Sequence, residues 1–236
     1  MRINKYIGES GMASRRGADR LVSDGRVTIN GELASLGSQV EPGDDVRIDG
    51  NPVRLTEDNK VYLALNKPIG ITSTTEKSVK GNIVDLVNHP LRVFHIGRLD
   101  KDSEGLILMT NDGDIVNEIL REEHGHEKEY VVTVDKPISA EFLRRMSAGV
   151  EILGTTTLPC KTKQLSNYDF KIILTQGLNR QIRRMTAALG YKVVALKRIR
   201  IMNIHLGNLA TGQWRDLTKK ERTELFKTLN YKREEW

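Results

Sequence analysis

The sequence is poor in cysteine and lacks long apolar runs. Cys160 is the only cysteine among 236 residues, so no internal disulfide can form, and we expect a reducing compartment. No run of about eighteen apolar residues exists, so no transmembrane helix is expected. The first residues, MRINKYIGES, lack the apolar core of a signal peptide. These absences predict a cytoplasmic protein without a membrane partner.

Patterns of metal and nucleotide sites are also missing. His95, His124 and His126 are not accompanied by further residues at the spacing of metal ligands. The segments SGMAS and TQGLN are too sparse in glycine for a nucleotide-binding phosphate loop. We therefore expect neither a metal nor any other cofactor.

What the chain does have is basic charge. Lysine and arginine total 37 against 31 acidic residues, which gives a net charge of +6 and a sequence pI near 9.4. This balance suggests a polyanionic partner, although many basic proteins bind no nucleic acid. The length allows one large domain, or one small and one medium domain.

The first fifty residues have the pattern of a small independent unit. Ile3 and Ile7 form a short helical stripe, Ser14 can cap a second helix, and Gly25 suits the end of that helix. Asn30-Gly31 is a strong hairpin signal. We therefore predict helix, helix, hairpin and strand within residues 1–52.

Basic residues are concentrated in this unit. Any one of them could simply belong to a solvated face, but together they predict a patch that contacts phosphate. The six residues are Arg2, Lys5, Arg15, Arg16, Arg20 and Arg26.

Residues 53–60 are predicted to be a linker, because Gly, Pro, Asn and charged residues occur around them without periodicity. A second domain is predicted over residues 61–236. Its strand-like segments, such as KEYVVTV and FKIILTQG, mix irregularly with helix-like segments such as SAEFLRRMSAG. The absence of regular strand–helix alternation argues against a Rossmann or barrel fold and predicts an α+β fold with a mixed sheet.

Three arginines gather at the start of a predicted helix in QGLNRQIRRMTAALGYKV. Arg180, Arg183 and Arg184 have the i, i+3, i+4 spacing of one helix face, beside the apolar positions Ile182 and Met185. Their charges oppose the helix dipole and repel one another, which points to an anionic partner. A solvated helix start is the alternative.

A basic strand is predicted at ALKRIRIMNI. Arg198 and Arg200 would project from one face of it and extend the basic surface. An ordinary amphipathic strand is equally compatible with the pattern.

The stretch HIGRLDKDSEGLILMT places charges between two apolar, strand-like flanks. A carboxylate there must stay hydrated, pair with a cation or become protonated. Asp100 follows Arg98 by two residues, so in an extended chain their side chains point to the same side. Asp100 could be a nucleophile, a proton acceptor or a structural ion-pair partner. Asp102 and Glu104 are interpreted as loop structure.

Several segments carry a family resemblance. LNKPIGITST, HIGRLDKDSEGLILMTNDGD, KEYVVTV and GLNRQIRRMTAALGYKV resemble, in this order, the motifs of the RsuA/RluF family of ribosomal RNA pseudouridine synthases. RINKYI, SRRGADRLVSDGRVTING and VEPGDDVRI resemble the S-four RNA-binding domain, which precedes the catalytic domain in that family. HEKEY, RIRIMNI and GQWRDLT are most similar to the RluF branch. The resemblance implies a synthase domain built on a mixed, mainly antiparallel sheet flanked by helices.

The resemblance also implies roles for single residues. Asp100 matches the catalytic aspartate, which acts at the ribose either by attack or by removing a proton, and Arg183 matches the cation that holds it. Arg98 matches the residue that fills the space left when the uridine flips out of the helix. Tyr130 matches the aromatic residue that stacks on the base, although it could simply be core. We interpret Lys67 as packing or backbone support.

The expected substrate is a specific uridine in large-subunit ribosomal RNA, with a tyrosine tRNA anticodon uridine as a second target, and the expected protein is a monomer. Arg180, Arg184, Arg198 and Arg200 are expected to join the RNA-binding surface. A non-catalytic RNA-binding or ribosome-assembly protein is the alternative, and a glycoside hydrolase that uses Asp100 and Asp102 is a more distant one. Some relatives continue into a basic tail, whereas this sequence ends at YKREEW. We expect either a member that lacks this tail or a shortened chain.

Overall fold

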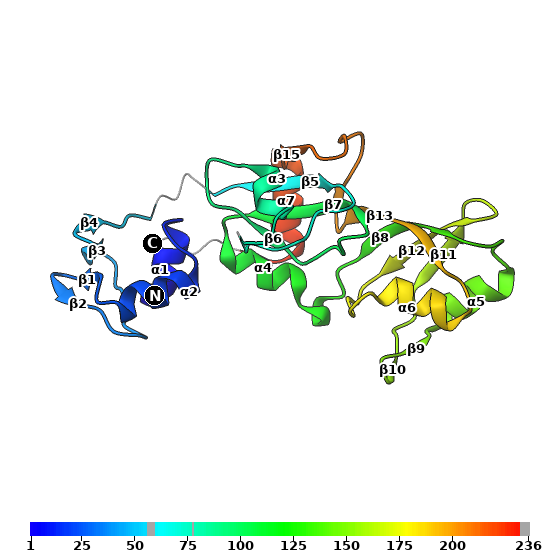
Figure 1. The fold of residues 1–236 in the computed structure, drawn as a ribbon, viewed down its shortest axis with the longest axis horizontal. Helices are drawn as coiled ribbons and strands as arrows, with labels where there is room; N and C mark the ends of the chain where they lie inside the picture. The colour runs from blue at the N-terminus through cyan, green and yellow to red at the C-terminus, as the bar shows by residue number, and fades with distance from the viewer. Residues whose placement is uncertain (56–59, 77, 232–236) are drawn as a thin grey trace.

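A computed structural model describes residues 1–55, 60–76 and 78–231. Residues 56–59 of the expected linker and residues 232–236 of the expected second domain lie outside the described residues. Figure 1 shows a small N-terminal part beside a larger part that holds the main sheet. The boundaries 1–52, 53–60 and 61–236 stay a prediction.

The N-terminal part has the predicted order of elements. Its helices are α1 (Ile3–Glu9) and α2 (Arg15–Ser23). Its sheet has the order β2-β1-β3-β4, with strands β1 (Val27–Ile29), β2 (Glu32–Leu33), β3 (Val46–Ile48) and β4 (Asn51–Pro52).

The local signals of this part act as predicted. The Ser14 hydroxyl accepts the backbone N–H of Gly17 at 3.0 Å, which caps α2. Asn30 and Gly31 have φ angles of 52° and 87°, which suits the tight turn between β1 and β2. The core of this part is formed by aliphatic residues from both helices and the sheet, and it includes Val53, at which the linker was expected to begin.

The larger part is built on a nine-stranded sheet. Its main path runs β11-β12-β8-β13-β7-β5-β15, with β14 beside β13 and β6 beside β7. The strands are β5 (Tyr62–Lys67), β6 (Phe94–Ile96), β7 (Glu104–Thr110), β8 (Lys128–Val134), β11 (Lys161–Gln164), β12 (Asp169–Leu174), β13 (Val193–Ile201), β14 (Ile204–His205) and β15 (Trp214–Asp216). A separate pair is formed by β9 (Glu151–Ile152) and β10 (Thr155–Thr156). Only β13 and β7 pair in parallel among the described strands, so the predicted mixed, mainly antiparallel sheet is confirmed.

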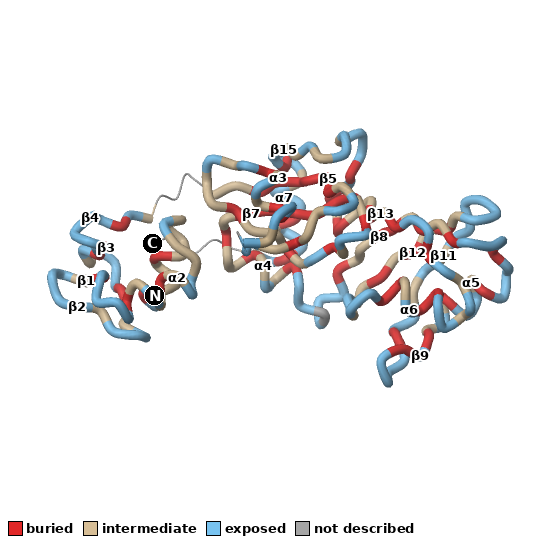
Figure 2. Tube along the Cα trace, viewed as in Figure 1, coloured by how far each residue is buried: buried red, intermediate tan, exposed pale blue. Residues whose placement is uncertain are grey.

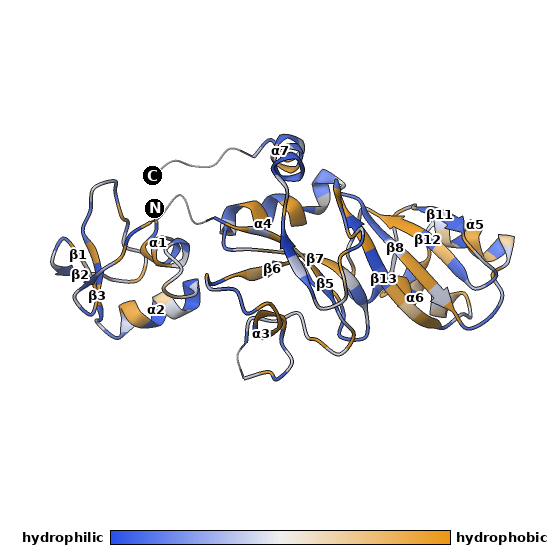
Figure 3. Ribbon diagram, turned by 90° about the horizontal axis from the view of Figure 1, so that it is seen from above, coloured by the Kyte–Doolittle hydropathy of each residue, from blue (hydrophilic) through white to orange (hydrophobic). Residues whose placement is uncertain are grey.

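Helices cover both faces of this sheet (Figure 3). One hydrophobic cluster lies under α3 (Ile83–Val87), α5 (Ala140–Ala148) and α6 (Gln181–Ala188). The other lies under α4 (Gly113–Leu120) and α7 (Lys219–Thr228), and a short 3-10 helix (Glu122–His124) follows α4. In the part of the chain that the structure describes, no helix is long and apolar enough to cross a membrane.

Burial from two sides explains the apolar runs of the central strands. All six residues of β5 are buried, and β7 is buried from Gly105 to Thr110, as Figure 2 shows in red. β12 lies nearer one end of the sheet and alternates between buried and half-buried residues. The polar loop between β6 and β7 therefore leads directly into a strand that is buried along almost all of its length.

Candidate active site

Residues 97–103 form the loop that connects the antiparallel pair β6 and β7. Leu99 is only 6% exposed and packs in the hydrophobic core. The Ser73 hydroxyl donates to the carbonyl of Leu99 at 2.8 Å and accepts its N–H at 3.3 Å. Leu99 thus anchors the loop to the hydrophobic core. Its neighbours Arg98 and Asp100 line two cavities, which are described below. This arrangement is why charged residues stand at the end of two apolar strands.

Further hydrogen bonds fix the backbone of this loop. The carbonyl of Lys101 accepts the N–H of Gly70 at 2.8 Å, and the carbonyl of Asp100 accepts the N–H of Ser103 at 3.0 Å. His95 Nδ1 lies 2.7 Å from the carbonyl of Gly97, so it is this ring nitrogen that carries the proton and donates. Asp100 is therefore held by a well-tied backbone.

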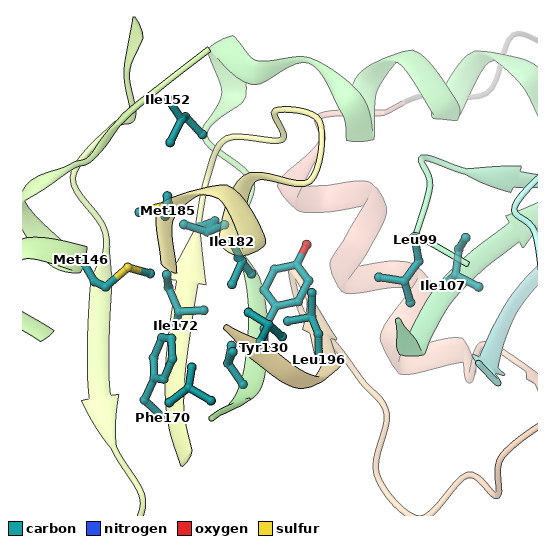
Figure 4. Close-up of a cluster of buried hydrophobic side chains, with 14 of the residues drawn as sticks. Leu99, Ile107, Tyr130, Met146, Ile152, Phe170, Ile172, Ile182, Met185 and Leu196 are labelled. Atoms are coloured by element: carbon teal, nitrogen blue, oxygen red, sulfur yellow. The ribbon is translucent and has the colours of Figure 1, made fainter. Parts of the chain in front are cut away.

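An inner cavity of about 210 Å³ opens beside Asp100. That volume is many times the ~10–15 Å³ that one water needs. Tyr130, Ile182 and Leu196 contribute to its wall, and Figure 4 shows these side chains around the tyrosine ring. Tyr130 is 9% exposed and belongs to the core cluster. The Tyr130 side chain thus packs in the core and also lines the cavity. Its stacking on a base stays a prediction.

An outer cavity of about 670 Å³ adjoins the inner one. The two share Arg98, Asp100 and Arg180, and the outer cavity adds His95 and Lys101. Asp100, whose side chain is 31% exposed, lies where the two cavities meet. A substrate group in either cavity can reach its carboxylate.

The cation that contacts Asp100 is Arg180, at 3.6 Å from Nη1 to Oδ2. Arg183 instead donates from Nη2 to the carbonyl of Asp102 at 2.8 Å and to the Ser103 hydroxyl at 3.1 Å. The expected pair of Arg183 with Asp100 is therefore wrong for the described structure. The reason is local, because Arg180 precedes α6 in a left-handed conformation (φ 50°) and does not share the helix face of Arg183.

The Asp102 carboxylate contacts both Arg180 and Arg183. Arg180 grips its carboxylate as a fork, at 3.0 and 2.8 Å, and Arg183 Nε lies 3.4 Å away. The hydrogen bonds from Arg180, and then the charge of Arg183, hold the pKa of Asp102 below its usual value. The carboxylate of Asp102 is thus committed to the arginines, in agreement with its interpretation as loop structure.

Arg198 does not extend the basic surface, contrary to the sequence-based expectation. It lies on a central strand and is only 4% exposed. Its Nε donates to the carbonyl of Leu106 at 2.6 Å, and its Nη1 lies 3.4 Å from the carbonyl of Arg98. The sequence predicted a strand here, but neither the register shift between Arg198 and Arg200 nor the depth at which the strand is buried. Arg198 supports the loop and the wall of the inner cavity beside Tyr130.

Arg200 is also removed from the expected surface. Its side chain is 13% exposed, and it donates to Glu129 at 2.7 Å and to Glu127 at 2.9 Å. Both carboxylates come from the segment that enters the neighbouring strand β8. Arg200 is therefore an internal ion-pair partner.

The remaining basic residues are more accessible. Arg184 is exposed and donates to the carbonyl and the side chain of Asn179, at 3.0 and 3.2 Å. In the N-terminal part, Lys5 pairs with Asp114 at 2.9 Å and Arg26 pairs with Asp49. The other predicted patch residues are exposed, namely Arg2, Arg15, Arg16 and Arg20.

Lys67 supports the backbone beside the site, as interpreted. Its side chain is fully buried, and Nζ donates to the carbonyls of Pro68 and Ile71, both at 2.9 Å. Burial lowers the pKa of Lys67 to about 8, against the partly compensating charges of Asp100 and Asp102.

This pKa predicts a pH-dependent stability. Between pH 8 and 10.5 the unfolded chain keeps a proton on Lys67 that the folded chain has lost, so the free energy of unfolding rises with pH in this window. We expect the unfolding free energy of the wild type, relative to Lys67→Met, to increase by about 1–2 kcal/mol from pH 7 to 9.5. Urea unfolding at both pH values measures it, and a constant difference would contradict the buried lysine as its source.

No group of three or more His, Cys, Asp or Glu side chains in residues 1–55, 60–76 and 78–231 is arranged to hold a metal ion. His124 and His126 stack edge to face at 5.3 Å between ring centroids. Each has a ring nitrogen near the carbonyl of Glu118, which is a structural contact.

Comparisons with known proteins agree on one family. The model of the RNA pseudouridylate synthase family matches residues 61–188, and that of the S-four (S4) domain matches residues 1–46. The dual-specificity RNA pseudouridine synthase RluF of Escherichia coli is 57% identical over 97% of this chain and 79% of its own length. The ribosomal large subunit pseudouridine synthase B of Bacillus subtilis is 34% identical over 93% of both chains. A crystal structure of a pseudouridylate synthase, 31% identical, superposes with a TM-score of 0.70 over 95% of this chain and 99% of the other.

Proposed function

The chain belongs to the RsuA/RluF family of RNA pseudouridine synthases, and on that premise we propose that it isomerises one specific uridine of large-subunit ribosomal RNA. A tyrosine tRNA anticodon uridine is the proposed second substrate. The observation that carries the proposal is Asp100, held by a tied loop where a cavity lined by Tyr130 meets a wider outer cavity. The expected monomer and the cytoplasmic location stay predictions.

In the proposed mechanism the target uridine leaves its helix and the base enters the inner cavity against Tyr130. Arg98 is exposed at the cavity mouth and occupies the vacated space in the RNA. The bond between the base nitrogen and the ribose breaks, the base rotates, and a base carbon bonds to the same ribose carbon. The proton of that base carbon is replaced by one on nitrogen, so the reaction needs no redox partner or activated donor.

Asp100 acts at the ribose in this mechanism, either by attacking it or by removing a proton. Both roles use the carboxylate group, and the nearest Arg180 nitrogen lies 3.6 Å from one of its oxygens. Arg180 is itself fixed by Asp102, so its charge stays near Asp100 when the cavities are empty. Arg183 fixes the backbone of the same loop and is a positioning residue.

RNA binding is assigned to the accessible basic residues. In the N-terminal domain these are Arg2, Arg15, Arg16 and Arg20, and at the site this is Arg184, whereas Arg180 would first have to leave Asp102. Their role is to neutralise phosphates, so affinity should fall with salt. Lys5 and Arg26 would have to leave their carboxylate partners first, and they are expected to contribute less.

We expect the purified protein to form pseudouridine in large-subunit ribosomal RNA, and in tyrosine tRNA, without added nucleotide and with chelator present. Chromatography of the nucleosides from nuclease digests separates pseudouridine from its isomer uridine and measures the product. A short unstructured RNA that contains the target serves as control, because chelation can unfold structured RNA without affecting the enzyme. Binding without any product in all three RNAs would contradict the proposal and favour the non-catalytic RNA-binding alternative.

A further inference from the structure

A groove of about 660 Å³ lies between the S-four domain and the synthase domain. One wall consists of residues of α1 and α2, and the other consists of residues 74–76 together with Arg92, Phe94, Asn111 and Gly113. Figures 1 and 3 both show α1 and α2 on the side of the small domain that faces α4. The groove is distinct from the two cavities at Asp100.

Two ion pairs connect the walls of this groove. Lys5 in α1 pairs with Asp114 in α4 at 2.9 Å. Lys60, just before β5, pairs with Glu9 at the end of α1. These ion pairs hold the two domains at the groove, so both walls can contact one ligand.

Four arginines of the groove carry a charge that no carboxylate among the described residues neutralises. Among the described residues, no hydrogen bond or ion pair is made by the side chains of Arg15, Arg16, Arg20 and Arg92. Glu76 is the one carboxylate in the wall that does not neutralise a lysine, and it accepts the Ser78 hydroxyl. The groove therefore has a surplus of positive charge, whereas Arg26 and Arg144, outside it, pair with carboxylates.

Arg92 is the most informative of the four. It is half-buried, and burial lowers its pKa without any nearby carboxylate to offset the loss of hydration. A desolvated cation is costly unless an anion accompanies it. Its guanidinium carbon lies 6.0 Å from the centroid of the Phe94 ring, which also lines the groove and offers a face on which a base can stack.

The groove and the outer cavity are formed by neighbouring residues of the same two segments. Thr74 and Phe94 line the groove, while their chain neighbours Ser73 and His95 line the outer cavity that contains Asp100. The groove therefore lies close to the outer cavity.

We propose that the groove binds the RNA strand that flanks the target uridine, with its phosphates on the α2 arginines and Arg92 and one base stacked on Phe94. This inference rests on the proposed function, because it takes RNA as the substrate. It assigns two residues of the synthase domain, Arg92 and Phe94, to RNA recognition. Both domains then grip the same strand, and the S-four domain sets which nucleotide reaches Asp100.

The test compares RNA binding by the full-length wild type and by Arg92→Ala, Phe94→Leu and Arg20→Ala. We expect each arginine variant to reduce the slope of log affinity against log salt by about one unit. Phe94→Leu should weaken binding about fivefold or more with the slope unchanged, since stacking is not a charge effect. Arg144→Ala is the matched control, because that exposed arginine pairs with Glu141 on α5 and should not affect binding.

Arg144→Ala should leave the single-turnover rate at saturating RNA within about twofold of the wild type, and thermal unfolding checks that all four variants are folded. If Arg92→Ala and Phe94→Leu bind RNA like the wild type while Arg20→Ala binds weakly, RNA meets the S-four domain alone and the groove proposal is wrong. Uridine monophosphate that displaces the RNA at comparable concentration would also overturn it, since the groove would then be a small-molecule site. Product formation is measured separately, so either result leaves the proposed function standing, and that function fails only if the wild type binds RNA without isomerising it.

Discussion

Asp100→Asn is expected to lower the rate of pseudouridine formation by more than about 10³-fold while RNA affinity stays within about threefold. The substitution keeps the size of the side chain but removes its charge and its ability to attack the ribose or accept a proton. Little structural loss should accompany it, because the carboxylate is partly exposed and its one ion pair is the 3.6 Å contact with Arg180. Single-turnover kinetics on saturating RNA measures the rate, and filter binding measures the affinity.

Asp102→Asn is the matched control. The same change is made two residues away, on a carboxylate that is more exposed and bound to the same Arg180. We expect it to weaken the ion pairs of Asp102 with Arg180 and Arg183. The rate of pseudouridine formation should fall no more than about tenfold, because Asp102 does not act on the substrate. Equal inactivation of both variants would remove Asp100 from its special role, as would near wild-type turnover by Asp100→Asn.

The second large effect is expected from Arg183→Ala. This change leaves the Ser103 hydroxyl, which is fully buried, and the carbonyl of Asp102 without their donor. We expect a loss of about 1–3 kcal/mol in the free energy of unfolding. Because the loop that carries Asp100 loses its anchor, the single-turnover rate should fall about 10²-fold. The salt dependence of RNA binding should hardly change, since Arg183 is mostly buried.

Arg184→Ala tests the same argument at the next residue. Arg184 is exposed and contacts Asn179, so its loss should lower RNA affinity and the salt slope by about one unit without affecting the rate at saturation. Arg183→Lys should rescue only in part, because one ammonium cannot reproduce the placed donors of a guanidinium. If Arg183 and Arg184 variants lose rate and affinity in parallel, both arginines are simply phosphate contacts.

Local signals in the sequence predicted the parts of the fold that local chemistry decides. Ser14 caps its helix and Asn30-Gly31 makes its turn. The segment around Asp100 was recognisable because charged residues stood between two apolar strands, a pattern that a plain turn does not need. These features depend on residues within a few positions of one another.

Features that depend on contacts distant in the sequence could not be predicted. The predicted alternation put Arg198 and Arg200 on one face, but β13 has a register shift between these two residues, and a strand pattern does not reveal how deeply the strand is buried in the sheet. The role of Ser73 depends on Leu99, 26 residues away. The family resemblance also predicted an ion pair between Arg183 and Asp100. In the structure it is Arg180 that contacts Asp100 and Asp102. Arg180 precedes α6 in a left-handed backbone conformation, which the sequence pattern did not indicate.

The most direct test is a map of pseudouridines in the ribosomal and transfer RNA of cells that carry this gene intact, deleted, or with Asp100→Asn. We predict that deletion removes pseudouridine from one uridine of large-subunit ribosomal RNA and from the tyrosine tRNA anticodon, that the wild-type gene restores both, and that Asp100→Asn restores neither. The account would be contradicted if every pseudouridine persisted in the deletion strain, or if the Asp100→Asn gene restored the lost ones.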